Sequence, residues 1–443
     1  MDKKKAKTKK PKPLKPKIEY RTQKQNIGGN ALTAREHRIL QQMAHSSKAL
    51  RNVALYTCRQ IYKEHKRSAT TKEIDSAMKA DVNYKMLQSN TVQAIRTAVK
   101  KEISSYFAAR KEYAKNPDKF TGRPRFPGYL DKEEKRIVEI YMVPKIIGGC
   151  WKLPMSKWFE QKYGTINIKL PTNLLGLHVK YIEIKPIQRG RFFEAHYTYK
   201  APKTNYSPNG KDNKLGIDLG VNCLASCVCS NGETFIIDGR RIKSINQYFN
   251  KAIAQQQQTN IKNGISKRVV TNKLKDLWRK RELKIDGYLG WAAGEIIHRC
   301  GELGVGEIAI GKSVGWKHES NLGKVNNQNF VQIPFNKLIA KIENLAKKHG
   351  IFTVVGEESY TSKASFYDRD DIPVFDKALQ GTYTFSGVRK PRGRYKSKDG
   401  RQLHGDINGA LNILRKSGLY EFPDDFVPKN PFIVKRKGKA TAA

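Results

Sequence analysis

The chain has 443 residues, room for about three domains, which excludes a single small module. Its 85 Lys and Arg residues outnumber 40 Asp and Glu residues and give a formal charge of +45, so the expected partner is a polyanion, with nucleic acid the leading candidate. No run of 18 apolar residues predicts a membrane span, and a basic protein of membrane surfaces is the weaker alternative.

The first part of the chain predicts a basic tail followed by helices. Residues 1–30 are rich in Lys and Pro and lack an apolar stretch, which is typical of a disordered tail and not of a signal peptide. Thr33-Ala-Arg-Glu36 has the sequence of a helix capping box, and apolar residues then recur at helical spacing. A second helical pattern runs from Ser89 to Lys115, so we expect a helical domain over residues 31–120.

The segment TGRPRFPGYL, residues 121–130, interleaves Arg with aromatic side chains. This composition suits contacts to phosphates and stacked bases, although a plain linker has the same Gly and Pro content. The basic residues of the second helical pattern could equally form a solvated face of a plain helical bundle instead of contacting nucleic acid. The candidate nucleic-acid contacts of this half are Arg96, Lys100, Arg123, Arg125, Phe126 and Tyr129.

Between Arg136 and Lys200 the apolar period changes to two, which predicts a β domain, expected as a small barrel within residues 121–212. Residues 201–213 are rich in Pro, Asn and Gly and mark a domain boundary. Beyond it, strand patterns in LGIDLG, CLASCVC, ETFIID, EIAIG and IFTVV alternate with helical patterns, including one helical stretch from Ile245 to Cys300. The sequence therefore predicts an α+β multidomain chain whose second half is a mixed or parallel sheet covered by helices.

The six cysteines have no regular spacing, which fits a reducing cytoplasm without disulfides. Three of them, Cys223, Cys227 and Cys229, lie in one strand pattern. A metal role is possible there, but buried strand thiols are favoured, because no second Cys or His pair stands at zinc spacing.

Carboxylates at strand ends and at a helix start are the candidate catalytic groups. Asp218 interrupts an apolar strand, Glu357 and Glu358 follow another, and Asp406 stands at a predicted helix start. Taken singly, each has an ordinary explanation: a structural ion pair, a solvated loop or a helix N-cap. Taken together in so basic a chain, they suit two Mg²⁺ ions that would support phosphodiester cleavage.

The motifs GIDLGVN, YTSK and GDINGALNI, in this order, resemble the RuvC-like nuclease domain of the TnpB family, which is similar to the miniature type V CRISPR effectors. SSKALRNVALYTCRQIY and KFTGRPRFPGY resemble parts of the same family further upstream. The resemblance implies a helical recognition lobe, a wedge β-barrel that starts within residues 1–30, an RNase H-like RuvC domain at 213–417 and a basic tail at 418–443. It also implies that the protein binds a guide RNA and recognises double-stranded DNA targets that lie beside a short flanking motif. The expected location is the bacterial cytoplasm, with association to the nucleoid when DNA is bound and no association with a membrane.

The sequence departs from the family pattern in two places. Gly311 stands where the middle catalytic glutamate is expected, but some relatives carry that glutamate three residues before the Thr of the Thr-Ser run, which here is Glu358. The resemblance thus implies Asp218, Glu358 and Asp406 as catalytic Mg²⁺ ligands, with Glu357 as the alternate. No cysteine follows Cys300, so no zinc is expected.

In place of a zinc ribbon, residues 365–403 are expected to form a metal-free lid. Asp370 and Asp371 within it are either further metal ligands or exposed loop acids. A solvated loop is a close alternative to the lid. If the segment is a lid, the residues expected to contact phosphates are Arg389, Arg392, Arg394 and Lys396.

The leading hypothesis is an RNA-guided, Mg²⁺-dependent DNA endonuclease. A guided DNA-binding protein without nuclease activity, acting as a repressor or targeting factor, is the main alternative, and Gly311 supports it. An RNA-binding protein with a relic nuclease fold and a strand-transferring transposase are weaker alternatives. Transposon and CRISPR contexts both remain open.

Overall fold

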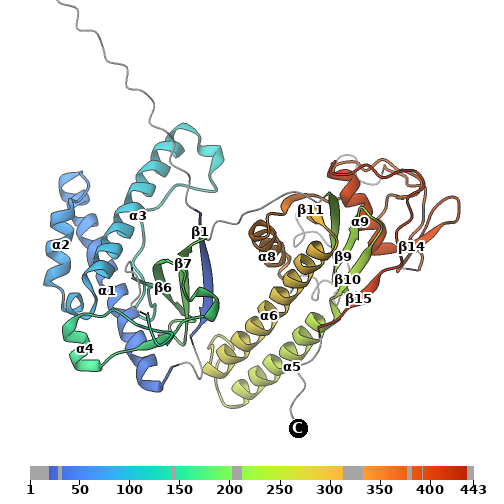
Figure 1. Ribbon diagram of the computed structural model, residues 1–443. Helices are drawn as coiled ribbons and strands as arrows, with labels where there is room; N and C mark the ends of the chain where they lie inside the picture. Colours follow the sequence, from blue (N-terminus) through green and yellow to red (C-terminus); the bar gives the residue numbers. More distant parts are fainter. Residues whose placement is uncertain are drawn as a thin grey trace, which may run out of the picture. The chain divides into compact units, whose positions relative to one another are not determined.

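The computed structural model describes residues 19–27, 32–140, 146–201, 212–312, 333–376, 382–391 and 393–436. The chain forms two compact units, Met1–Lys203 and Thr204–Ala443, each with its own core (Figure 1). The residues before position 19, expected as a tail, lie outside the described ranges. None of the helices within those ranges is long and apolar enough to cross a bilayer.

The described part of the first unit contains three longer helices, and the first of them begins at the predicted capping box. At the start of the first, the backbone N–H of Glu36 donates to Thr33 Oγ1 at 3.2 Å, and Thr33 N–H donates to the Glu36 carboxylate at 2.8 Å, so the expected capping box is present. The helices are α1 (Ala34–His65), α2 (Thr71–Ala80), α3 (Ser89–Lys115) and the shorter α4 (Lys157–Tyr163). Short 3-10 helices cover Val82–Met86, Pro117–Lys119 and Thr172–Leu174.

The β segments of the first unit form two separate sheets. One is antiparallel with the order β1-β7-β6-β2, and the other has the order β3-β4-β5. The strands are β1 (Tyr20–Asn26), β2 (Val138–Ile140), β3 (Ile146–Ile147), β4 (Cys150–Lys152), β5 (Asn167–Lys169), β6 (Val179–Ile187) and β7 (Phe192–Lys200). A small barrel was the expectation, but within the described residues β1 and β2 stay at opposite edges and no sheet closes.

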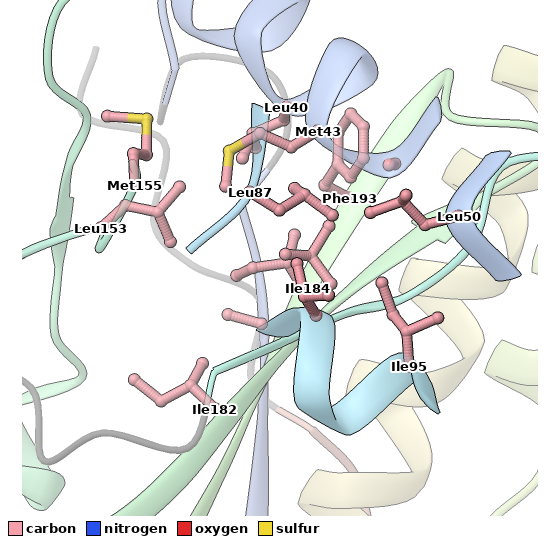
Figure 2. Close-up of a cluster of buried hydrophobic side chains, with 14 of the residues drawn as sticks. Leu40, Met43, Leu50, Leu87, Ile95, Leu153, Met155, Ile182, Ile184 and Phe193 are labelled. Atoms are coloured by element: carbon pink, nitrogen blue, oxygen red, sulfur yellow. The ribbon is translucent and has the colours of Figure 1, made fainter. Parts of the chain in front are cut away.

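Helices and sheet of the first unit share one apolar core. Figure 2 shows side chains from α1, α3, β6 and β7 in a single cluster, among them Leu40, Ile95, Ile184 and Phe193. Period-two alternation places Ile182 and Ile184 on one face of β6, where α1 and α3 cover them. The predicted helical and β segments therefore stabilise each other.

The second unit is built on a mixed six-stranded sheet with the order β12-β11-β8-β9-β10-β15. The β8–β9 and β9–β10 pairs are antiparallel, and the remaining pairs are parallel. The strands are β8 (Asn213–Leu219), β9 (Cys223–Cys229), β10 (Thr234–Asp238), β11 (Val305–Lys312), β12 (Phe352–Glu357) and β15 (Phe432–Val434). The last strand comes from the segment expected as a basic tail, so residues up to Arg436 belong partly to the sheet.

Helices cover both faces of this sheet. One face packs on the helices after β10 and β11, and the other packs on the helix near the C-terminus. The helices are α5 (Arg240–Lys262), α6 (Asn272–Glu302), α8 (Phe335–Lys348) and α9 (Gly405–Lys416), and β13 (Arg394–Lys396) pairs with β14 (Gln402–His404). The single helical stretch expected from Ile245 to Cys300 is two helices, because the chain turns through Gly264, whose φ is +73°.

Candidate active site

Asp218 lies on the α9 face of β8. Successive strand residues point to opposite faces, so the buried Leu215 and Ile217 face α6 and α8, while Gly216 and Asp218 face α9. A Cβ on Gly216 would lie 2.4 Å from the carbonyl oxygen of Ala410, so only glycine lets α9 lie this close to the strand.

Gly409 gives the Asp218 carboxylate its place against α9. A Cβ at position 409 would lie 2.7 Å from Asp218 Oδ2. Both glycines belong to the GIDLG and NGALN motifs, and both are required by the same strand–helix contact. The motifs thus bring Asp218 next to the first turns of α9.

Glu358 fills the space beside Gly311. A Cβ on Gly311 would lie 2.8 Å from Glu358 Oε2 and 3.1 Å from Glu358 Cβ. Strands β11 and β12 are parallel neighbours with Gly311 opposite Gly356, and Glu358 follows directly after β12. The Glu358 carboxylate therefore lies against Gly311, the position where the sequence pattern led us to expect an acid.

Glu357 has a different environment from Glu358. Its Oε2 accepts a hydrogen bond from Lys416 Nζ at 2.5 Å, and its Oε1 accepts one from the Ser359 N–H at 2.7 Å. Burial tends to raise the pKa of Glu357, but the hydrogen bonds from Lys416 and Ser359 outweigh it and the pKa is lowered. Glu357 is thus the ionised half of a mostly buried ion pair.

Asp406 lies in the first turn of α9, where the helix dipole favours a negative charge. The N-cap is His404, whose Nδ1 accepts from the Asp406 N–H at 3.3 Å, so the ordinary explanation of Asp406 as the cap residue is wrong. The Arg389 guanidinium forms an ion pair with the Asp406 carboxylate. Arg389, expected to contact phosphates, therefore faces the acidic site.

The electrostatics show that Asp218, Glu358 and Asp406 lie close together. The pKa of Asp218 is raised well above its usual value, first because burial disfavours the charged carboxylate and then because the carboxylates of Glu358 and Asp406 lie nearby. The Arg389 guanidinium opposes this shift. Three carboxylates, two from strand ends and one from a helix start, thus lie in the same part of the second unit, and carboxylate oxygens are the ligands that Mg²⁺ prefers.

Two buried asparagines of α9 hold the turn after Glu358. Asn408 Nδ2 donates to the Ala364 carbonyl at 2.8 Å, and its Oδ1 accepts from the Phe366 N–H at 3.0 Å. Asn412 Nδ2 donates to the carbonyls of Thr361 and Ala364 at 2.9 and 2.7 Å. Sequence reasoning missed both residues, although two Asn four positions apart on an apolar helix were a visible signal.

The segment expected as a lid is anchored by hydrogen bonds of its side chains. Asp370 accepts hydrogen bonds from the backbone N–H groups of Ser365 and Ser386 at 2.7 and 3.0 Å, so it holds two loops together. The buried Tyr395 donates its hydroxyl to the Lys363 carbonyl at 2.6 Å. Arg394 and Lys396 are exposed, Asp371 is exposed, and Arg392 lies outside the described residues.

The basic candidates of the first unit fall into two groups. Arg96 forms an ion pair with Asp75 at 2.5 Å, and Lys100 donates to Thr71 Oγ1 at 2.9 Å, so both connect α3 to α2. Arg123 and Arg125 are exposed. Arg123 and Arg125 are therefore accessible to a ligand, whereas Arg96 and Lys100 are engaged in contacts between helices.

The loop that carries Phe126 and Tyr129 is docked on α1. The Arg59 guanidinium lies over both rings, 5.1 and 4.7 Å from their centroids, and donates to the Pro127 carbonyl at 2.8 Å. Arg51 and Asn52 hold the carbonyls of Gly128 and Leu130 at 3.0 and 2.9 Å. A plain linker would not be fixed by five such contacts.

The second unit is thus an α/β domain with a group of carboxylates between its sheet and the helix α9 near its C-terminus. Residues 196–317 match the OrfB_IS605 family, described as "Probable transposase". The TnpB-like protein ORF457 of Acidianus two-tailed virus is 31% identical over 215 residues, or 47% of this chain and 42% of the viral protein. The chain is thus similar to this family over residues 196–317, and it spans less than half the length of that curated relative.

A solved structure supports the overall fold. The protein in a Cas12f1-sgRNA-target DNA complex aligns with 86% of this chain and 83% of its own, with a TM-score of 0.53 and 17% sequence identity. At this identity the likeness concerns the fold alone. It agrees with the mixed α+β, multidomain architecture expected from the sequence.

Proposed function

We propose that the protein is an RNA-guided DNA endonuclease whose second unit is a RuvC-like domain of the RNase H type. Support for this domain comes from the strand order β10-β9-β8-β11-β12, in which three antiparallel strands are extended by two parallel ones. The observation that carries the proposal is the placement of Glu358 against Gly311 and of Asp218 against Gly409 of α9, the helix whose first turn holds Asp406.

In this proposal Asp218, Glu358 and Asp406 hold two Mg²⁺ ions, which when bound would activate water and stabilise the leaving oxygen of a phosphodiester. Gly311 and Gly409 leave the space that two of these carboxylates occupy. Asn408 and Asn412 keep the turn after Glu358 in place. Glu357 is assigned a structural role with Lys416.

Guide RNA and double-stranded DNA are the proposed partners. The charge of +45 supports a polyanionic ligand, and the solved protein of similar fold is bound to an sgRNA and target DNA. Exposed Arg123 and Arg125 in the first unit, and Arg394 and Lys396 in the second, are the proposed phosphate contacts.

The test is cleavage of a plasmid that matches the RNA recovered with the purified protein, with Mg²⁺ and with EDTA. We expect Asp218→Ala to abolish metal-dependent cleavage while RNA and DNA binding are retained. Cleavage by Asp218→Ala at the wild-type rate would refute the site. Binding without any metal-dependent cleavage by the wild type would favour a guided DNA-binding protein.

A further inference from the structure

A second group of metal-binding side chains adjoins the acidic site. Cys223 at the start of β9, His404 at the end of β14 and Asp406 in the first turn of α9 each offer one ligand atom, and these atoms all lie within 4.8 Å of one another. The three residues come from three elements, and each is only partly exposed. The proposed nuclease mechanism uses only one of them, Asp406.

The donor atoms of this group differ from those of the acidic site. Sulfur, imidazole nitrogen and carboxylate oxygen together form a donor set typical of Zn²⁺, whereas Mg²⁺ prefers oxygen ligands alone. Three protein ligands at one place leave a fourth position for water. Asp406 is the one residue that both donor sets require.

The local chemistry is compatible with a cation at this place. The Cys223 sulfur lies beside the Asp406 carboxylate, because the ligand atoms of Cys223, His404 and Asp406 are all within 4.8 Å of one another. Binding of Zn²⁺ would form a zinc–sulfur bond and release the thiol proton to solvent. The positive charge of a bound Zn²⁺ ion would also take over the interaction with the Asp406 carboxylate that Arg389 now makes.

We propose that Cys223, His404 and Asp406 bind one Zn²⁺ ion and that this ion withdraws Asp406 from the Mg²⁺ ligand set, so that Zn²⁺ inhibits the nuclease. The zinc site stands on its own geometry. Its inhibitory effect rests on the proposed function. A chain of this kind would cleave DNA only where free Zn²⁺ is scarce.

Binding is measured with the full untagged chain by competition against a chromophoric zinc chelator in excess Mg²⁺. We expect one Zn²⁺ per chain for the wild type, and an affinity at least about tenfold lower for Cys223→Ala, since even loss of an outer-shell partner typically costs that much. Cys150→Ala is the matched control, because Cys150 is the other cysteine with partial exposure. Equal zinc affinity in the wild type and Cys223→Ala would overturn the site.

Thermal unfolding provides a readout that does not depend on activity. Zn²⁺ should raise the melting temperature of the wild type and of Cys150→Ala, because a ligand that binds only the folded chain stabilises it. The same addition should not raise that of Cys223→Ala, or of Cys223→Ser should the alanine variant fail to fold. A zinc-dependent increase of equal size in the Cys223 variants would contradict the assignment.

Cleavage separates this inference from the proposed function. With Mg²⁺ present, added Zn²⁺ should inhibit the wild type and Cys150→Ala but leave Cys223→Ala active. No cleavage by the wild type without Zn²⁺ would refute the proposed function, while the chelator assay would still decide the zinc site. Zinc bound at Cys223 without inhibition of an active wild type would overturn the inhibitory role.

Discussion

Glu357 and Glu358 are neighbours in sequence, but their carboxylates interact with different partners. Glu357 binds Lys416 and the backbone of Ser359, whereas Glu358 lies beside Gly311 and close enough to Asp218 to raise its pKa. The sequence left open which of the two is the metal ligand. The geometry favours Glu358.

This difference predicts opposite outcomes for two isosteric changes. Glu358→Gln removes a charge from the acidic site and should reduce metal-dependent cleavage by at least about 100-fold, with little change in melting temperature. Glu357→Gln should retain cleavage but lower the free energy of unfolding by about 1–3 kcal/mol, because Lys416 loses its charged partner. Plasmid cleavage and thermal unfolding of both variants check this, and the reverse pattern would exchange the two roles.

Asn412 is the second residue whose role the structure defines. Its side chain is fully buried, and its amide satisfies two carbonyl groups of the turn after Glu358. Asn412→Leu should lower the free energy of unfolding by about 1–3 kcal/mol, because those carbonyls would lose buried hydrogen bonds.

Asn344→Leu is the matched control for this prediction. Asn344 is an exposed residue of α8 whose amide donates to the Ala340 carbonyl of its own helix, so its replacement should change stability by less than about 0.5 kcal/mol. Denaturant unfolding measures both variants. Similar stability losses would show that the buried asparagine hydrogen bonds do not hold the turn.

At the scale of elements, α9 organises the site. It lies across β8 because Gly216 permits close contact, it carries Asp406 in its first turn, and its asparagines hold the turn that follows β12. Gly409 is the point where this helix meets the Asp218 carboxylate. The position of the proposed catalytic groups thus depends on the contact between α9 and β8.

Gly409→Ala tests that contact. An added methyl group would displace Asp218, because the new Cβ would lie 2.7 Å from its Oδ2. We expect metal-dependent cleavage to fall by at least about tenfold, which corresponds to about 1.4 kcal/mol in the barrier. The variant should show none of the stability gain that alanine usually brings to a helix.

Gly294→Ala in α6 is the control, since nothing lies within 4 Å of its Cβ position and the residue is exposed. It should stabilise the chain by about 0.5–1 kcal/mol and leave cleavage unchanged. Cleavage assays and melting temperatures measure both variants. Full activity of Gly409→Ala would mean that Asp218 does not need its present position.

For the whole molecule, the charge of +45 indicates a polyanionic ligand but not the place where such a ligand would bind. Many of the basic side chains are engaged within the protein, as Arg96 is with Asp75 and Arg51 with Glu102. Exposed guanidinium groups such as those of Arg123 and Arg125 remain available to phosphates. The net charge alone does not distinguish basic residues that form ion pairs within the protein from those that are exposed.

Nucleic-acid binding provides the prediction at this scale. The double variant Arg123→Gln/Arg125→Gln should bind RNA more weakly and reduce the slope of log affinity against log salt by about 2, since each phosphate contact contributes about 1. Its melting temperature should not change. Arg96→Gln, the control, should lower stability and leave the salt slope unchanged, as measured by filter binding over a salt series and thermal unfolding.

The sequence alone determined those properties that depend on composition and local pattern. The capping box at Thr33, the alternation along β6 and the polyanionic ligand follow from local hydrogen bonding, side-chain period and charge, which need no knowledge of distant residues. The motif spacing also indicated the resemblance to the TnpB family, which the family match supports.

Only the tertiary structure decided which residues meet. Two sheets in the first unit replace the expected barrel, a strand forms within the expected C-terminal tail, and Arg389 faces Asp406. The proximity of Glu358 to Gly311, and of Cys223 to His404, joins residues far apart in the chain. Such contacts depend on how strands and helices pack, because period and propensity define the face of an element but not its partner.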